Sequence, residues 1–169
     1  MKKIFAIALV LMLTLSCAYA VEPSLSQFTC ADDKGNLQTE AIFADYDMTV
    51  INIWSPWCLA CASDVPKYVN LVNQLPENVN LITICDMNED EYDIVHSVVT
   101  EAKANYITLL ANDEIRKELL FDFQMLPVTI FVDSEGNLVG DPLYSAAEQE
   151  NMIENYLKAI DEHLALLEA

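Results

Sequence analysis

Two cysteines stand two residues apart in the stretch WSPWCLACASDVP, which runs from Trp54 to Pro66. A pair at this spacing can bind a metal ion, close a structural disulfide, or carry two electrons by making and breaking a disulfide. Cys58 is expected where a helix begins, and the free N–H groups and dipole of a helix start lower a thiol pKa below its usual value of about 8.5. Cys61 follows one turn later. We therefore expect Cys58 to attack a disulfide and Cys61 to resolve the mixed disulfide that results.

The sequence disfavours the two other roles of the pair. A structural zinc site needs about four protein ligands, and the two histidines, His96 and His163, lie far from the cysteines and from each other in sequence. A disulfide between residues this close encloses a short loop, which constrains the unfolded chain little. The pair is therefore predicted to be redox-active, with no metal ion and no bound cofactor.

The cysteine pair follows a run of apolar, β-branched residues and precedes a helical pattern. Residues 49–54 (TVINIW) are expected to form a buried central strand. A helix is expected from about residue 58 to residue 74, and Pro76 would end it. The apolar positions that mark its buried face are Leu59, Val65, Tyr68, Val69 and Val72.

Strands and helices alternate along the rest of the chain. A hairpin is expected at residues 27–38, with its turn at residues 33–36. Further strands are expected at residues 79–85, 106–110, 127–133 and 138–140, and helices at residues 91–104, at residues 113–121 and from Ser145, which has capping-box spacing to Glu148. This order predicts an α/β fold whose sheet has helices on both faces, with parallel neighbours where helices connect the strands.

The residues around the cysteines resemble the N-F-W-A-x-W-C-x-x-C-x-x-E-x-P motif of a known family. This family comprises the thioredoxin-fold disulfide reductases of the bacterial envelope, of the TlpA/ResA type. The resemblance extends from about Gln27 to the end of the chain and includes the later stretch MLPVTIFVDSEGNLVG. It implies a thioredoxin-like fold, with a central mixed β-sheet flanked by helices and an extra N-terminal β hairpin.

The resemblance also implies roles for single residues. Cys58 and Cys61 match the redox pair, and Trp57 matches the tryptophan that shields and positions the active surface. Pro127 matches the cis proline that faces the disulfide, and Leu126 before it would offer its backbone to an extended substrate strand. Pro66 matches the proline that kinks the first helix.

Four positions depart from the family pattern. Asn52 stands where thioredoxins have a buried aspartate that handles the proton of the second cysteine, and an amide cannot titrate. Asp64 matches the glutamate that the envelope subfamily carries near the pair, but it is equally consistent with an acid on an exposed helix surface. The intervening residues Leu59 and Ala60 supply no positive charge to stabilise a thiolate. Because strong oxidants have a stabilised reduced form, the pair is predicted to act as a reductant or isomerase.

Residues 1–20 have the layout of a secretory signal peptide. Two lysines precede a twelve-residue apolar run at residues 4–15, and the small-x-small pattern Ala18-Tyr19-Ala20 follows. The run is short for a transmembrane helix, which needs about 20 residues. Cleavage after Ala20 would leave a thioredoxin-like domain at residues 21–169. An uncleaved N-terminal anchor is the alternative.

The sequence TLSC within this segment is also close to a bacterial lipoprotein signal. Cleavage after Ser16 would then leave Cys17 as the first residue, carrying a lipid anchor. Both kinds of cleavage imply export, and the expected location is the periplasm or the outer face of the bacterial membrane.

Charge and chemistry together indicate the class of partner. Residues 21–169 contain 27 acidic and six basic residues, a net charge of −21, which disfavours nucleic acid and anionic lipid surfaces. The redox chemistry implies cysteine-containing exported proteins as partners, and an upstream thiol donor such as a membrane reductase. The membrane itself would be contacted only through a lipid anchor. The alternative from another class is a binding module that retains the fold as a scaffold.

Three further features have simpler interpretations beside functional ones. Cys30 and Cys85 lie on different predicted strands and are either bridged or buried free thiols. Residues 86–93 (DMNEDEYD) are similar to a calcium loop but lack its turn glycine and closing glutamate, so a solvated acidic loop is expected. His163 neighbours the apolar face of the last helix and is expected to be an ordinary surface histidine.

Overall fold

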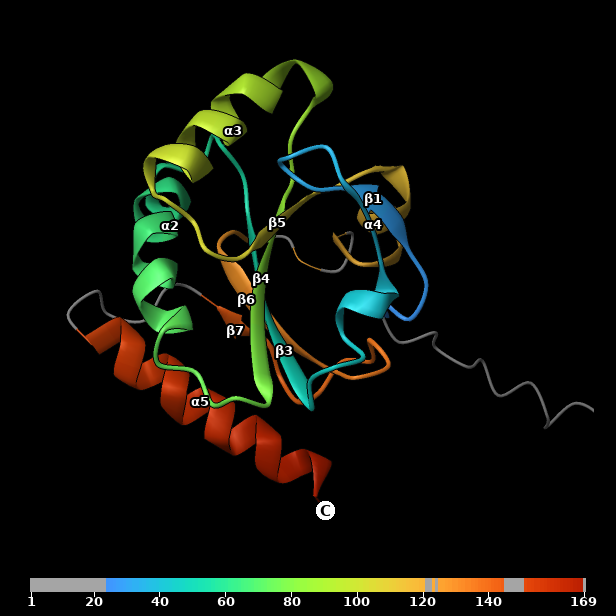
Figure 1. Ribbon diagram of the computed structural model, residues 1–169, viewed down its shortest axis with the longest axis vertical. Coiled ribbons are helices and arrows are strands. Elements are labelled where there is room, and N and C mark those ends of the chain that lie inside the picture. Colours follow the sequence, from blue (N-terminus) through green and yellow to red (C-terminus); the bar gives the residue numbers. More distant parts are fainter. Residues whose placement is uncertain (1–23, 121–122, 124, 145–150, 169) are drawn as a thin grey trace, which may run out of the picture.

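The structure is a computed structural model, and it describes residues 24–120, 123, 125–144 and 151–168 (Figure 1). The predicted signal peptide, both of its cleavage sites and Cys17 lie outside the described residues. The predicted capping box of Ser145 and Glu148 lies outside them too.

A five-stranded mixed sheet forms the centre of the molecule, in the order β5-β4-β3-β6-β7. Its strands are β3 (Met48–Trp54), β4 (Val79–Cys85), β5 (Ile107–Leu110), β6 (Val128–Asp133) and β7 (Leu143–Tyr144). β3, β4 and β5 are parallel to one another, whereas β6 pairs antiparallel with β3 and with β7. The predicted hairpin is confirmed as a separate sheet of β1 (Thr29–Ala31) and β2 (Leu37–Thr39).

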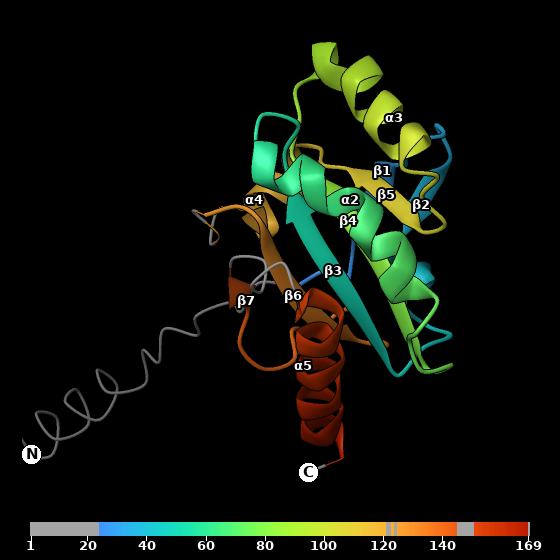
Figure 2. The ribbon, with the colours of Figure 1, turned by 90° about the vertical axis from the view of Figure 1, so that its left-hand side faces the viewer.

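Helices lie on both sides of this sheet, as predicted. They are α2 (Leu59–Val72), α3 (Tyr92–Glu101), α4 (Asp113–Glu118) and α5 (Met152–Leu167), with short 3-10 helices η1 (Glu40–Ile42) and η2 (Glu89–Glu91). Figure 1 shows the sheet nearly edge-on, with α2 and α5 on one side and α4 and the hairpin on the other. Figure 2, viewed from the side of α2, shows α2 and α5 in front of the strands.

Side chains of β3 alternate between two hydrophobic clusters, one on each face of the sheet. Val50 and Trp54 belong to the cluster that also contains Tyr68 of α2. Ile51 and Ile53 belong to the opposite cluster. All seven residues of β3 are buried, which is why its sequence is a continuous apolar run rather than an alternating one.

Helix α2 begins one residue after the cysteine that was predicted to start it. Cys58 is its N-cap residue, and Pro66 lies inside the helix. The buried side chains of α2 are Cys61, Asp64, Val65, Tyr68 and Leu71. The prediction that Leu59 faces the core is wrong, because this first helical residue is 86% exposed.

The prediction of a strand at residues 138–140 is also wrong. Leu138 makes a single bridge to Val132, and Gly140, with φ of +65°, then turns the chain toward β7. A Cβ atom at Gly140 would lie 2.7 Å from the ring of His163. That ring stacks on Phe131 at 3.8 Å between centroids, so His163 is a packed residue and not the ordinary surface histidine that was expected.

Cys30 and Cys85 are buried free thiols, not a bridged pair. Cys30 belongs to the hydrophobic cluster beside α4, and Cys85 belongs to the cluster beside α2, so the sheet separates them. Burial raises the pKa of Cys30 to about 12 and raises that of Cys85 as well. Neither thiol is ionised near neutral pH, and neither is placed to react with a partner protein.

Candidate active site

The two cysteines of the motif form a disulfide at the start of α2. The S–S distance is 2.11 Å and the two Cα atoms lie 5.2 Å apart. The backbone N–H of Cys61 points at the sulfur of Cys58 from 3.2 Å, so one of the free amides in the first turn of the helix is directed at this atom. Hydrogen bonds from such amides favour a thiolate over a thiol once the bond is reduced.

The two sulfur atoms differ in accessibility. Cys58 is partly exposed, whereas Cys61 is only 1% exposed and belongs to the hydrophobic core. A partner protein can therefore reach Cys58 but not Cys61. This asymmetry fits a first step at Cys58 and an intramolecular second step at Cys61.

The segment before β6 lies against the disulfide. The peptide bond between Leu126 and Pro127 is cis. The carbonyl oxygen of Leu126 is 3.8 Å from the sulfur of Cys58, a contact rather than a hydrogen bond because a disulfide sulfur carries no hydrogen. β6 pairs with β3, and this pairing brings Leu126 next to a residue 68 positions earlier. A partly exposed backbone at this place can pair with an extended peptide.

Three exposed apolar side chains come from the two segments that meet at the disulfide. Trp57 is 70% exposed, Leu59 is 86% exposed and Met125 is 64% exposed. We call these three residues the apolar rim. Exposed apolar groups gathered in one place commonly mark a surface that binds another protein. Met125 was not singled out from the sequence, although it directly precedes Leu126 and Pro127.

Solved structures of other proteins have the same arrangement of elements. No protein-family model matches the sequence, and no curated protein matches it either. A secreted disulfide oxidoreductase of Mycobacterium tuberculosis, homologous to E. coli DsbE, is 19% identical, with a TM-score of 0.61 over 79% of this chain and 96% of that one. A thioredoxin-family thiol:disulfide interchange protein of Chlorobium tepidum is 14% identical, with a TM-score of 0.69 over 87% and 99%.

An exposed lipoprotein thioredoxin of Streptococcus pneumoniae is 15% identical, with a TM-score of 0.60 over 79% of this chain and 98% of that one. The chain has the thioredoxin fold. Its mixed sheet, flanking helices and N-terminal hairpin confirm the fold that the sequence predicted. At these identities the likeness concerns the fold, and the TlpA/ResA type stays a prediction.

Asp64 is buried one turn beyond Cys61, so the alternative of an exposed helix-surface acid is wrong. Its side chain is 1% exposed, and Oδ1 accepts a hydrogen bond from Nζ of Lys67 at 2.5 Å. The second oxygen, Oδ2, is buried and has no hydrogen-bond partner. A buried carboxylate oxygen with unused acceptor capacity can take a proton from a neighbouring group.

Asn52 belongs to a buried row of polar side chains beneath α2. The strand register places Thr108, Thr83, Asn52 and Thr129 side by side across β5, β4, β3 and β6. The amide of Asn52 donates to Thr129 Oγ1 at 3.1 Å, and this hydroxyl lies 2.7 Å from the hydroxyl of Tyr156. Asn52 therefore has a hydrogen-bonding role in the core. An aspartate at this position would add a second buried carboxylate beside that of Asp64 on this face of the sheet.

Glu91 is a further residue of the site that the sequence did not reveal. It lies in η2, is 5% exposed, and accepts a hydrogen bond from the indole nitrogen of Trp57 at 2.5 Å. The backbone N–H and the side-chain amide of Asn88 donate to it as well, at 2.9 and 2.8 Å. Hydrogen bonds from the Asn88 backbone, the indole and the Asn88 side chain hold the pKa of Glu91 below its usual value. Residues 88–90 are exposed as expected, but the acidic loop is not solvated throughout.

The described part of the chain contains no group of three or more His, Cys, Asp or Glu side chains placed to hold a metal ion. None of its helices combines the length and apolar character that crossing a bilayer requires.

Proposed function

We propose that this protein is an extracytoplasmic thiol–disulfide oxidoreductase that reduces disulfides in exported proteins. The observation that carries the proposal is the Cys58–Cys61 disulfide at a helix start, with one reachable sulfur and one buried sulfur. The apolar rim and the backbone of Leu126 beside Cys58 supply a surface on which a protein partner can lie.

The reaction begins from the reduced pair. The thiolate of Cys58 attacks one sulfur of the partner's disulfide, and the partner's other sulfur leaves as a thiolate. Cys61 then loses its proton and attacks the sulfur of Cys58, which re-forms the Cys58–Cys61 disulfide. The partner's second sulfur leaves as a thiolate, so two electrons have passed from the chain to the partner. An upstream dithiol donor, such as a membrane reductase, reduces the pair again.

Electrostatics support reduction as the direction. Neither Leu59 nor Ala60 carries a charge, and no basic side chain therefore lies between the cysteines to stabilise a thiolate. The one cation close along α2, Lys67, is already paired with Asp64. A pair whose thiolate has helix amides but no free basic side chain to stabilise it is a poorer oxidant and a better reductant.

Two further considerations support a location outside the cytoplasm. Residues 1–20 have the pattern of an export signal, and the stretch TLSC that ends at Cys17 is close to a lipoprotein signal. The structural neighbours include a protein described as secreted and one described as an exposed lipoprotein. Both fit the TlpA/ResA type of envelope reductase.

Asp64 is proposed as the base that accepts the proton of Cys61 in the second step. The change Asp64→Asn is expected to slow the closing of the mixed disulfide by about 100-fold at neutral pH, because general bases contribute at least that factor. The first attack by Cys58 should keep its rate. Acid quenching and mass spectrometry, after mixing the reduced protein with a peptide disulfide, measure both steps.

Lys67→Gln is the matched control for this change, since it breaks the same ion pair but leaves the carboxylate in place. Closing should remain within a few-fold of the wild-type rate in this variant. An equal slowing in both variants would assign Asp64 a structural role and exclude it as the base.

The proposed function is tested by the reduction of insulin with dithiothreitol as the electron source. Acceleration by the wild-type protein is expected. A chain that binds partners but leaves the insulin rate unchanged would instead be the binding module that retains the fold as a scaffold.

A further inference from the structure

Trp57 is exposed and yet held in place. About two thirds of its surface faces solvent, at 70% exposure, but its indole nitrogen donates a 2.5 Å hydrogen bond to Glu91. The two residues are 34 positions apart, and Glu91 comes from the segment between β4 and α3. An exposed tryptophan without such a bond samples several rotamers, so the bond selects one orientation of the ring.

The acceptor itself is fixed from within its own segment. Oε1 of Glu91 accepts hydrogen bonds from the indole of Trp57 and from the side-chain amide of Asn88. Oε2 accepts one from the backbone N–H of Asn88. The bond from the Asn88 backbone is one half of a capping box on η2, in which the backbone N–H of Glu91 points back at the Asn88 side chain. The carboxylate therefore cannot turn away from the indole without losing its bonds to Asn88.

The segment that carries Glu91 is also anchored to the body of the fold. The N–H of Asp86 donates to the carbonyl oxygen of Trp54 at 2.8 Å, which extends the pairing of β4 with β3. Arg116 of α4 donates to Asp86 Oδ1 at 2.8 Å and to the carbonyl oxygen of Met87. Residues 86–91 thus connect the indole of Trp57 to the central sheet and to α4, which lies on the opposite side of the sheet from α2 (Figure 1).

We propose that Glu91 is a positioning residue for disulfide exchange, holding the indole of Trp57 so that the apolar rim is already formed when a partner protein arrives. This inference rests on the proposed function. A preformed rim spares the partner the ordering of a large side chain on binding, which favours protein substrates over small disulfides that need no such surface. Glu91 touches neither sulfur and acts only through Trp57.

The first test is whether the bond exists in solution. In a nitrogen-15 correlation spectrum, Trp54 and Trp57 each give an indole N–H signal, and Trp57→Phe assigns them. Glu91→Leu is expected to move the Trp57 signal upfield and speed its exchange with water, while the signal of buried Trp54 stays in place. Glu91→Gln retains an acceptor oxygen and should move the signal less.

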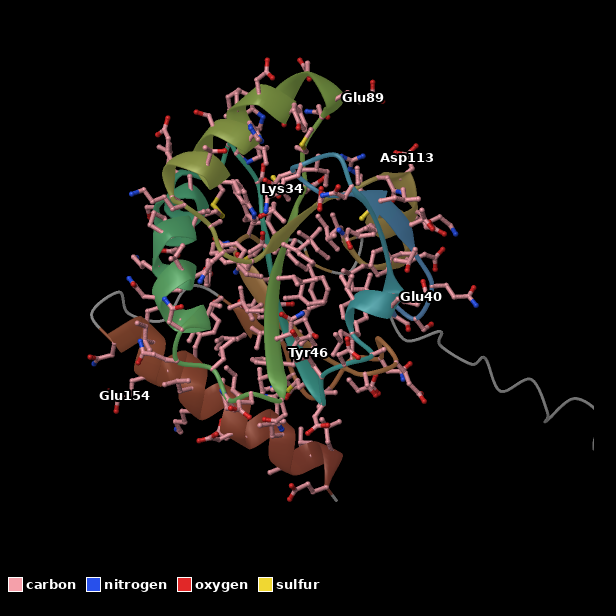
Figure 3. All side chains as sticks on the ribbon, viewed as in Figure 1. Lys34, Glu40, Tyr46, Glu89, Asp113 and Glu154 are labelled. Carbon is pink, nitrogen blue, oxygen red and sulfur yellow. A yellow bond between two sulfur atoms is a disulfide. The ribbon has the colours of Figure 1, made fainter. Side chains whose placement is uncertain are left out.

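Glu89→Leu is the matched control, because it makes the same change two residues away, at an exposed position on the outer surface of the molecule (Figure 3). It should leave both indole signals unchanged. An unchanged Trp57 signal in Glu91→Leu would overturn the inference at this stage.

The second test compares a protein disulfide with a small one. Glu91→Leu is expected to lower kcat/KM for insulin about fivefold, mainly through KM, and to change the rate with 2-hydroxyethyl disulfide by less than about 1.5-fold. Glu91→Gln should recover most of the insulin rate, and Glu89→Leu should match the wild type. Equal loss with both substrates, or no loss with insulin, would overturn the positioning role.

The two proposals fail in different ways. If the wild-type protein accelerates neither reaction, the proposed function fails and the positioning role fails with it. If the wild type is active and Glu91→Leu reduces insulin at the wild-type rate, only the inference on Glu91 fails.

Discussion

Replacing Cys58 with serine is expected to return insulin reduction to the rate of dithiothreitol alone. A serine hydroxyl is not ionised at neutral pH and cannot form a mixed disulfide, so the first step of exchange has no nucleophile. Cys61 cannot replace it, because its sulfur is 1% exposed and a protein disulfide cannot reach it. The measurement is the turbidity of reduced insulin against time, with and without each variant.

Cys30→Ala is the matched control for this loss. It also removes a thiol, but this thiol is buried and its pKa is raised. It belongs to the hydrophobic cluster on the opposite face of the sheet from Cys61. Its activity per folded molecule should equal that of the wild type. Activity that survives in Cys58→Ser, or disappears in Cys30→Ala, would place the reaction at another sulfur.

Replacing Cys61 with serine is expected to convert the protein from a catalyst into a trap. Cys58 retains its place at the helix start and its contact with Leu126, so the first attack proceeds. The second attack has no nucleophile, and the mixed disulfide with the partner accumulates. In its native host, the variant should carry exported proteins bound through Cys58, visible as bands that disappear on reduction.

The double variant Cys58→Ser, Cys61→Ser provides the comparison for this experiment and should trap nothing. Partners that remain attached to the double variant, through Cys30 or Cys85, would contradict the assignment of Cys58 as the attacking sulfur. Identification of the trapped proteins by mass spectrometry would also name the substrates, which the sequence alone does not specify.

The parts of the fold that follow from local patterns could be predicted from the sequence. β4 has the predicted bounds, Val79–Cys85, because a run of buried β-branched residues between a proline turn and an acidic loop has one plausible structure. Cys58 was expected at a helix start, and it is the N-cap of α2. The residue pattern around Asp33 and Gly35 likewise marks the turn of the hairpin.

The parts that depend on distant contacts could not be predicted. Glu91 stands in a run of acids where residues 89 and 90 are exposed, and only the fold brings its carboxylate to Trp57. The burial of Asp64 depends on how α2 lies on the sheet and on Lys67 reaching back to it. The family resemblance pointed to Asp64, although not to its burial, but no pattern in the sequence distinguishes Glu91 from its solvated neighbours.

Errors in the prediction have the same origin. Leu59 is apolar and on a helix, so periodicity assigned it to the core, but it lies at the first position of α2 and is exposed. His163 has no apolar character in a sequence scan, yet it packs on Phe131 because Gly140 leaves room for its ring. Packing between distant segments decided the position of His163.

The most direct test of the central claim is the reduction potential of the Cys58–Cys61 pair, measured by equilibrating the protein in glutathione and dithiothreitol buffers and counting alkylated thiols by mass spectrometry. A single two-electron transition is expected between the values typical of thioredoxin and of protein disulfide isomerase, about −270 and −180 mV. A value near −120 mV would contradict the assignment as a reductant. A value below about −300 mV would identify a structural disulfide and contradict reversible exchange itself.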